Sequence, residues 1–462
     1  NNRPNPSCTV VRDTRHTEHK RAQTIRAKCG SLTSLWITLV GGVIAAASTG
    51  VALGAALGLT GLFILYFFSN GATSIAIDAI WNVFNSFTLS AVPMFILLGE
   101  ILLRSGISER AYSAFAPVFR NIPGGLLHTN IAVCTLFGAV SGSSLSTAAA
   151  VGSVAYPEMS KRGYDQDTVV GSLAGGGTLG LLIPPSLSFL IYGALTETSI
   201  GRLFAAGIIP GMMVGAMFMT YLLVKCLRNP AIAPHDPNRS SLLNILKGFR
   251  HIWPLLLLIF AVIGSIVFGI ATPTESAGVG VVLAILICSV WGDLTLSKLI
   301  VAIYQSVLLF TSIGFLVLGA TILAQSVSIL GLPQQILENV AQSGFGPYSV
   351  LLFVILIYLV LGCFFDGLSL MIMTLPVVFP LLTGLGFDPI WIGVIITIVI
   401  EIGQITPPVG LNLSVLTALT NNEVTLGRAA YATVPYWLIH LCAIGIITMF
   451  PVLVLFLPNL FF

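Results

Sequence analysis

Apolar residues run through this chain in long stretches that short polar connections separate. After the first 32 residues, ten stretches have about the 17 to 25 apolar residues that a helix needs to cross a bilayer. They are predicted at 33–48, 50–68, 80–104, 166–194, 203–227, 252–270, 275–291, 304–330, 387–419 and 433–457. The pattern therefore predicts an all-α polytopic membrane protein.

Two further apolar stretches, 126–156 and 348–382, have a polar centre that contains glycine. The centres are Ser-Gly-Ser-Ser at 141–144 and Asp-Gly-Leu-Ser at 366–369. An apolar arm of about 15 residues rises only about 22 Å as a helix, which is too short to cross the membrane. We therefore expect two re-entrant hairpins, and shorter amphipathic helices on the membrane surface at 108–121 and 332–342.

Two predicted spans contain a double proline. The first lies in Gly-Thr-Leu-Gly-Leu-Leu-Ile-Pro-Pro-Ser at 177–186, and the second in Gly-Gln-Ile-Thr-Pro-Pro at 403–408. Two adjacent prolines remove two backbone donors and clash with the preceding turn, so the helix has to open there. Open backbone inside a bilayer is tolerated where it is buried in protein or lines a polar cavity. The two breaks therefore indicate a binding site.

The breaks belong to an internal repeat with a fixed offset of 223 residues. The offset superimposes these residues: Ser143 on Asp366, Pro157 on Pro380, Gly163 on Gly386, Asp165 on Asp388, Gly180 on Gly403, and Pro184-Pro185 on Pro407-Pro408. We predict a first repeat at 33–230 and a second at 251–462, joined by a hydrophilic cytoplasmic loop at 231–250. Residues 1–32 form a polar, basic leader that begins without Met, as a trimmed or non-native leader would, and we assign it no fold.

The basic residues test the topology. Five crossings and one hairpin per repeat make the two repeats inverted relative to each other. With the 231–250 loop in the cytoplasm, the other basic residues after the leader also lie inside except Arg202, as the positive-inside rule expects. The leader does not fit this topology, because its seven basic residues would lie on the outer side of the membrane. Either it is not native, or 33–68 crosses only once.

Composition agrees with a membrane protein and excludes several functions. The chain is 56% hydrophobic and 8% charged, with a mean hydropathy of +0.98, far from soluble averages. Its seven cysteines are scattered without a C-x-x-C pair, so we interpret them as small buried apolar residues. We expect no nucleic-acid partner and no organic cofactor.

Several motifs resemble one family in order and spacing. They are FTLSAVPMFILLGE at 87–100, GSS at 142–144, GYD at 163–165, GTLGLLIPPS at 177–186, SIGRLFAAGIIPG at 199–211, TPTES at 272–276 and GQITPPVGLN at 403–412. Together they resemble the large permease subunit, the M subunit, of a tripartite ATP-independent periplasmic (TRAP) transporter. The resemblance covers nearly the whole chain after the leader.

The resemblance implies a sodium-coupled importer of a small carboxylate, such as a C4-dicarboxylate or sialic acid, in the bacterial inner membrane. It implies an elevator-type motion of a hairpin-bearing domain, with Na⁺ as the coupling ion. It also implies two partners on separate chains, a small membrane subunit (Q) and a periplasmic substrate-binding protein (P). Thr49 to Gly54 departs from the family pattern, which commonly has a proline there.

If the chain binds a carboxylate and Na⁺, the hairpin tips and the breaks are the parts expected to hold them. Helix N-termini suit an anion, and unwound carbonyls with hydroxyl or amide oxygens suit a cation. We expect the substrate between the tips, at Ser143, Ser144, Pro184, Pro185, Ser186, Asp366, Pro407 and Pro408. We expect one Na⁺ site in each half, at Ser141, Gly142, Gly177, Thr178 and Gly180, and at Gly367, Ser369, Gly403, Thr406 and Asn412.

Other ionisable residues have simpler interpretations. Asp366 is expected to serve the site, with capping of the second hairpin arm as the alternative. For Glu100 and Glu401 three interpretations stay open: pairing with a basic group, lining a domain interface, or contact with an ion. Glu275 is interpreted as a first-turn helix carboxylate. His128, His251 and His440 are interpreted as structural, because no Cys or carboxylate lies at ligand spacing.

Two alternatives remain beside the tripartite transporter. One is a divalent-anion and sodium symporter with the same fold that works without a binding protein. The other is an intramembrane enzyme such as a protease. The sequence has no H-E-x-x-H, G-x-S-G or paired Gly-x-Gly-Asp motif, and an enzyme would not explain the duplicated breaks. We therefore do not expect an enzyme.

Overall fold

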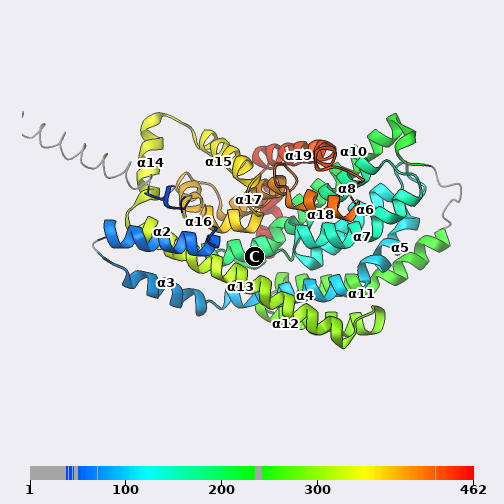
Figure 1. Ribbon diagram of the computed structural model, residues 1–462, viewed down its shortest axis with the longest axis horizontal. Helices are drawn as coiled ribbons and strands as arrows, with labels where there is room; N and C mark the ends of the chain where they lie inside the picture. The colour runs from blue at the N-terminus through cyan, green and yellow to red at the C-terminus, as the bar shows by residue number, and fades with distance from the viewer. Residues whose placement is uncertain are drawn as a thin grey trace, which may run out of the picture. The chain divides into compact units, whose positions relative to one another are not determined.

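The computed structural model describes residues 38, 39, 41–43, 45, 50–69, 71–234, 242–421 and 423–462 (Figure 1). Every regular element among these residues is helical. Six of the described helices are long and apolar enough to cross a membrane. The prediction of an all-α polytopic membrane protein is confirmed. The expected leader at 1–32 and most of the expected span at 33–48 lie outside the described residues.

The described residues separate into two compact units, and the smaller comprises those up to residue 82 together with 315–332. Here α2 (Leu53–Phe68) packs against the C-terminal part of α13 (Leu296–Ile329). Glycines allow the approach, because a Cβ at Gly54 would lie 2.5 Å from the Phe315 carbonyl oxygen. Small residues at such crossings are typical of helix pairs in membranes. Leu65, Ala76 and Ile322 form the buried apolar cluster of this unit.

The larger unit, 83–314 and 333–462, contains the helices other than α2, most of α3 (Ser74–Phe84) and the end of α13. Before the central loop these are α4 (Ala91–Arg104), α5 (Ile107–Phe119), α6 (Leu126–Ser141), α7 (Ser144–Lys161), α8 (Gln166–Leu182), α9 (Leu187–Thr196) and α10 (Ile200–Arg228). After it come α11 (Leu242–Val267), α12 (Pro273–Trp291), the first part of α13, α14 (Leu332–Ser343), α15 (Pro347–Gly362), α16 (Gly367–Gly384), α17 (Pro389–Gln404), α18 (Leu411–Leu419), α19 (Leu426–Met449) and α20 (Val452–Phe461).

Five consecutive helices occur twice in the larger unit. The order in α6 to α10 is a helical hairpin, a helix broken at Pro-Pro, and a helix that follows the break, and α15 to α19 repeat it. The corresponding helices α8 and α17 begin in the same way. Asp165 caps α8 and Asp388 caps α17, and these two residues lie 223 positions apart. The two predicted hairpins are therefore helix-turn-helix units, and α5 and α14 match the two predicted amphipathic helices.

Helix α8 lies at the centre of the larger unit. It packs against both arms of the first hairpin, α6 and α7, and also against α10, α17, α18 and α19. In the candidate span Gln166–Thr196, which α8 and α9 form together, the apolar 18-residue window is 89% buried, far more than in any other candidate span among the described residues. A membrane helix that other helices enclose does not need to face lipid, so its glycines and hydroxyls are available for close packing and polar contacts.

Three predicted boundaries differ from the structure. The expected single span at 433–457 is wrong: α19 ends at Met449 and α20 begins at Val452, because Pro451 cannot continue the hydrogen-bonding of α19. The expected span at 80–104 is a pair of helices bent by 53°, with α3 (Ser74–Phe84) ending before Thr88. Helix α11 begins at Leu242, inside the stretch expected to be a loop.

Candidate functional site

The tip of the first hairpin is a two-residue turn between α6 and α7. Gly142 has a φ of +60°, and a Cβ there would lie 3.0 Å from the Pro185 carbonyl oxygen. Only glycine combines this left-handed backbone with so close an approach. Ser143 caps α7, because its hydroxyl accepts a hydrogen bond from the Ser146 backbone N–H at 3.4 Å. The tip is thus held directly against the first break.

At the first break, serine hydroxyls supply a hydrogen bond that the helix backbone no longer makes. Pro185 has no N–H, so the Leu181 carbonyl loses its normal helical donor. The Ser186 and Ser188 hydroxyls donate to that carbonyl instead, the latter at 3.0 Å. The Leu187 N–H then donates to the Gly142 carbonyl of the hairpin tip at 3.2 Å. The Leu181 carbonyl and the Leu187 N–H are therefore both satisfied inside the protein, as burial requires.

The second tip and break are built in the same way. Asp366 caps α16 by accepting from the Ser369 backbone N–H at 3.1 Å and from its hydroxyl at 3.2 Å. The Val409 N–H donates to the Cys363 carbonyl at 3.2 Å, which again joins a tip to a break. Both Pro-Pro peptide bonds, 184–185 and 407–408, are cis. Capping by Asp366, the simpler of its two interpretations, is thus observed.

Glycine pairs set the distance between each hairpin and its broken helix. A Cβ on Gly138 would lie 2.6 Å from the Gly180 Cα, and a Cβ on Gly403 would lie 2.6 Å from the Gly362 Cα. Backbones this close leave no room for a side chain, and the neighbouring atoms are backbone atoms that cannot turn away. The predicted site glycines Gly180 and Gly403 therefore bring tip and break together in both halves.

Several side-chain hydrogen bonds join the two halves, and one of them lies at the first hairpin tip. Asn412, the second residue of α18, donates from Nδ2 to the Ser144 hydroxyl at 2.7 Å, and Ser144 is the first residue of α7. Both side chains are fully buried. A second link joins Thr397 to Ser188 at 3.3 Å. Asn412, assigned from the sequence to the second half, thus lies against the tip of the first.

The two breaks differ in exposure. Pro184, Pro185 and Ser186 are buried, whereas Pro407 and Pro408 are exposed. The tips follow the same trend, since Ser144 is buried while Asp366 is half-buried. The first tip and break are therefore enclosed by protein, whereas the second tip and break lie at the protein surface.

Several of the predicted Na⁺ ligands already have hydrogen-bond partners. The Thr178 hydroxyl donates to the Gly175 carbonyl at 2.6 Å and lies 3.3 Å from His440 Nε2. The Thr406 hydroxyl donates to the Ile402 carbonyl at 2.6 Å. Ser141 shares a hydrogen bond of 2.7 Å with Thr147, a residue that sequence reasoning missed. Thr147 follows Ser143 by four residues, so a helical period from the cap would have indicated it.

Gln404 is a second residue missed from the sequence. A Cβ on Gly367 at the second tip would lie 2.6 Å from Gln404 Nε2, so the amide lies directly against the start of α16. The Gln404 side chain is buried. Its position inside the Gly-Gln-Ile-Thr-Pro-Pro motif was the available signal, because a polar residue in a buried apolar helix is commonly functional.

The intramembrane acids have three different environments. Glu100 pairs with Arg104 at 3.1 Å, one of the alternatives expected for it. Glu275 accepts from the Thr272 N–H at 2.8 Å in a capping box, which confirms its interpretation as a first-turn carboxylate. Glu401 is fully buried, and the polar groups nearest to its carboxylate are the Ser144 hydroxyl and the Leu181 backbone. Glu401 is therefore the unusual acid of this region.

The histidines have ordinary structural contacts where the structure describes them. His128 lies 2.9 Å from the Pro123 carbonyl oxygen, and His440 lies 3.0 Å from the Tyr436 carbonyl oxygen. The side chain of His251 lies outside the described part. Within that part, no group of three or more His, Cys, Asp or Glu residues could hold a metal ion. Any cation site at the breaks would therefore take most of its ligands from carbonyl, hydroxyl and amide oxygens, with at most one or two carboxylates.

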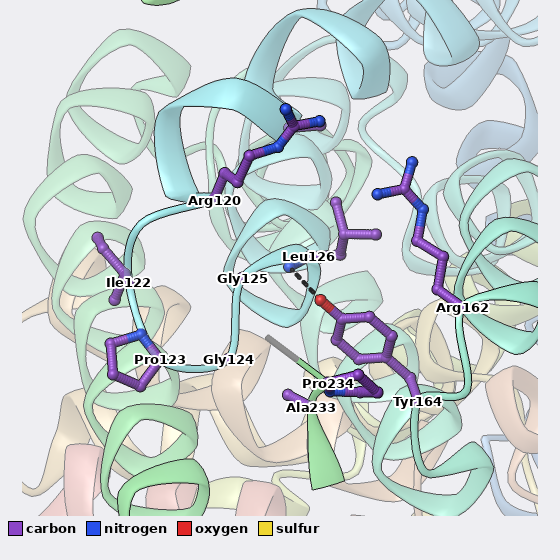
Figure 2. Close-up of a pocket in the computed structure, with 11 residues that line it drawn as sticks. Arg120, Ile122, Pro123, Gly124, Gly125, Leu126, Arg162, Tyr164, Ala233 and Pro234 are labelled. Carbon is purple, nitrogen blue, oxygen red and sulfur yellow. Dashed lines mark hydrogen bonds between the residues drawn. The ribbon is translucent and has the colours of Figure 1, made fainter. Parts of the chain in front are cut away.

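A pocket of about 320 Å³ lies at the base of the first hairpin, at the opposite end of α6 from the tip (Figure 2). It is lined by Ala116, Arg120, Ile122, Pro123, Gly124, Gly125, Leu126, Arg162, Tyr164, Ala233 and Pro234. Figure 2 shows the Tyr164 side chain reaching toward α6, where its hydroxyl accepts from the Leu126 N–H at 3.4 Å. Helix α6 rises about 24 Å between base and tip, so this pocket is separate from the predicted site.

Comparison with known structures supports the fold. The chain matches the Alcanivorax borkumensis YdaH transporter with a TM-score of 0.63 and 14% sequence identity, over 83% of this chain and 90% of the other. The crystal structure of that transporter was described as having an unusual topology. At this identity the match concerns the fold alone.

Comparison with known sequences gives the family. The large permease protein DctM of a C4-dicarboxylate TRAP transporter from Pseudomonas aeruginosa is 36% identical, over 87% of this chain and 93% of that protein. The ectoine/5-hydroxyectoine permease UehC of Ruegeria pomeroyi is 34% identical, over 81% and 87%. The sialic acid permease SiaM of Vibrio cholerae is 31% identical, over 82% and 87%. Residues 40–453 match the family profile of the tripartite ATP-independent periplasmic transporter, DctM component, so the chain belongs to the large permease subunits of TRAP transporters.

Proposed function

We propose that this chain imports a small carboxylate, with a C4-dicarboxylate as the first candidate, by coupling its movement to Na⁺. It works with a small permease subunit and a periplasmic binding protein in a bacterial inner membrane. The relatives named for C4-dicarboxylate and sialic acid transport support a carboxylate. The ectoine relatives show that the family serves more than one substrate class, so similarity alone leaves the substrate a proposal.

One observation carries the proposal for an anion. The hydrogen bond from Asn412 to Ser144 brings the first turn of α18 against the first turn of α7. Each helix N-terminus presents unsatisfied N–H groups and about half a positive charge. Two such ends placed together repel each other, and an anion between them would relieve the repulsion. A substrate carboxylate is the anion that we propose for this position.

The oxygens around each tip support a role for Na⁺. Ser141, Ser143 and Thr147 surround the first tip, and Asp366 and Ser369 form the start of the second arm. Unwound backbone and hydroxyl oxygens of this kind are what a dehydrated Na⁺ requires. We propose one Na⁺ at each tip. Transport then follows from movement of the hairpins and broken helices as one elevator-type domain.

The sodium proposal predicts a stabilisation that depends on Asp366. Na⁺ is expected to raise the thermal unfolding temperature of the purified chain above that in K⁺ of equal ionic strength. A ligand at 100 times its dissociation constant stabilises by about 2.7 kcal/mol. Asp366→Ala should remove a large part of this Na⁺-dependent increase, because the second tip loses its carboxylate.

Asp388→Ala is the matched control for this measurement. Both aspartates cap a helix of the second repeat, so each substitution should cost about 1 kcal/mol without Na⁺. Only Asp366 lies at a hairpin tip, so Asp388→Ala should keep the full Na⁺ increment. An equal increment in the wild type and in Asp366→Ala would remove Asp366 from the sodium site.

A further inference from the structure

The pocket at the base of the first hairpin has no part in the proposed transport chemistry. Four segments meet there: the end of α5, the turn into α6, the turn from α7 to α8, and residues 233–234 after α10. Its volume of about 320 Å³ lies at the lower end of the range for small-ligand pockets. Two of its lining residues are arginines and none is an acid. The pocket therefore has the size and the charge to hold a small anionic group.

The two arginines reach the pocket from different helices. Arg120 follows the last residue of α5, and Arg162 follows the last residue of α7. Figure 2 shows their guanidinium groups on the same side of the pocket, with Leu126 between them. Arg162 also donates to Glu158 Oε1 from Nε at 2.9 Å and from one terminal nitrogen at 2.6 Å. A guanidinium has five N–H donors, so this ion pair does not prevent contact with a further anion.

The turn into α6 brings backbone to the pocket wall. Gly124 has a φ of +100° and Gly125 a φ of +38°, a left-handed backbone that favours glycine. A Cβ on Gly125 would lie 3.0 Å from the Tyr164 hydroxyl, which accepts from the Leu126 N–H. Leu126 is the first residue of α6, so the positive end of that helix dipole also lies at the pocket. The helix end and the two arginines thus make the potential in the pocket positive.

Tyr112 supplies a further polar atom beside the pocket. It lies in α5, its side chain is buried, and its hydroxyl has no hydrogen-bond partner among the described residues. It does not line the pocket itself, but it is close enough to interact electrostatically with Tyr164, Glu158 and Arg162. Buried hydroxyls normally have a hydrogen-bond partner. An orphaned hydroxyl next to two lining residues therefore points to a polar ligand in this region.

The surroundings of the pocket are those of a membrane surface. Gly124 lies against the end of α10, because a Cβ there would lie 3.3 Å from Cys226 Sγ. Val224 and Leu227 on the same end of α10 are apolar and yet exposed, as is Ile122 on the pocket wall. Exposed apolar side chains that gather in this way are typical of a surface that contacts lipid. The pocket therefore opens beside the part of the chain that faces the bilayer.

A lipid phosphate fits this lining better than a free anion does. Arginine forks match the oxygens of a phosphate group, and basic pockets at the cytoplasmic side of a membrane suit anionic headgroups. The side is consistent, because residues 233–234 begin the loop that is predicted to be cytoplasmic. A free anion has no use for the apolar part of the lining, whereas a lipid brings an apolar body with its phosphate. The apolar lining residues are Ala116, Ile122, Pro123, Leu126, Ala233 and Pro234.

We propose that this pocket binds the phosphate group of an anionic phospholipid from the cytoplasmic leaflet. Arg120 and Arg162 hold the phosphate oxygens, and the apolar part of the lipid lies along Ile122 and the exposed end of α10. A phosphate that contacts both arginines ties the end of α5 to the base of the first hairpin. This site is independent of substrate and of Na⁺, so it does not rest on the proposed function.

Native mass spectrometry of the purified full chain in detergent tests the site, because it counts bound lipids. Phosphatidylglycerol should bind more tightly than phosphatidylcholine, whose headgroup has no net charge. Combining Arg120→Gln with Arg162→Gln should weaken phosphatidylglycerol binding about 25-fold, since each basic residue near a membrane surface contributes about fivefold. Both arginines lie at helix ends near the surface, so the double variant should fold, as its elution from a sizing column would report. Equal binding of the two lipids by the wild type overturns the proposal.

The matched control combines Arg110→Gln with Lys161→Gln. It also removes one positive charge from α5 and one from α7, but neither residue lines the pocket. This variant should bind phosphatidylglycerol as the wild type does, and an equal loss in both double variants would mean that surface charge alone attracts the lipid.

Two further arms separate the pocket from its surroundings and the lipid from a free anion. Ala233→Trp fills the pocket without changing its charge and should weaken binding as well. Full binding by this variant would place the lipid elsewhere and overturn the site. Inorganic phosphate should not displace phosphatidylglycerol from the wild type at equal concentration. Displacement that is lost in the arginine double variant would make the ligand free phosphate and overturn the lipid as its source.

Discussion

Replacing both Pro184 and Pro185 with alanine is expected to abolish transport while the protein remains folded. The substitutions restore an N–H at position 185, which can donate to the Leu181 carbonyl as in a regular helix. Each proline in a helix interior costs about 3 kcal/mol, so their removal favours joining α8 to α9. The Leu187 N–H would then leave the Gly142 carbonyl, and the first tip would lose its contact with the break.

The measurement is Na⁺-driven uptake, together with hydrogen exchange of the Leu187 amide. Uptake should fall by at least about tenfold, which corresponds to a free-energy cost of about 1.4 kcal/mol for forming the conformation that transports. The matched control is Pro435→Ala, because Pro435 lies within the continuous helix α19 and opens no break. Wild-type uptake by the double variant, with unchanged sodium dependence, would refute the role of the open backbone.

Gly180→Ala is expected to have the second large effect. The new methyl group would lie 2.6 Å from the Thr147 hydroxyl and 2.7 Å from the Ser143 carbonyl oxygen. The carbonyl belongs to the backbone of the first tip, so the clash can be relieved only if the hairpin moves away from α8. Overpacking of this kind typically costs about 1 to 3 kcal/mol. We expect lower thermal stability and loss of uptake together.

Gly445→Ala is the control, because Gly445 is also helical but has nothing within 4 Å of an added Cβ. Alanine is the better helix former by about 1 kcal/mol, so this variant should be as stable as the wild type or more so. Comparable stability and uptake in the two glycine variants would show that the close approach of hairpin and broken helix is not needed.

Much of the fold could be predicted because membrane helices and their interruptions leave strong local signals. Double prolines marked the two breaks, and the Gly-Ser and Asp-Gly centres marked the two turns. The bend near Thr88 was missed although Asn85 and Ser86 interrupt the apolar run there, and the end of α19 was missed although Pro451 follows it. Hydropathy reports length and burial, and it does not report where a helix changes direction.

The site was harder to predict, because it depends on contacts between distant segments. The repeat assigned each break to its own hairpin, and the Leu187 and Val409 amides contact those tips. The repeat could not indicate that Asn412 reaches Ser144 of the other half, since the register places Phe189, an apolar residue, opposite Asn412. It also could not distinguish Glu100 from Glu401. One acid has Arg104 a single turn away, and the other lies beside the neutral Ser144 and Leu181 groups of the first half.

Reconstitution tests the central claim most directly. The chain is placed in proteoliposomes with the small permease encoded beside it, and uptake of a labelled C4-dicarboxylate is followed with the binding protein outside. The account predicts uptake that requires an inward Na⁺ gradient, the small permease and the binding protein together. Equal uptake without a Na⁺ gradient would contradict the coupling. Uptake by this chain alone would favour a stand-alone symporter and contradict the tripartite account.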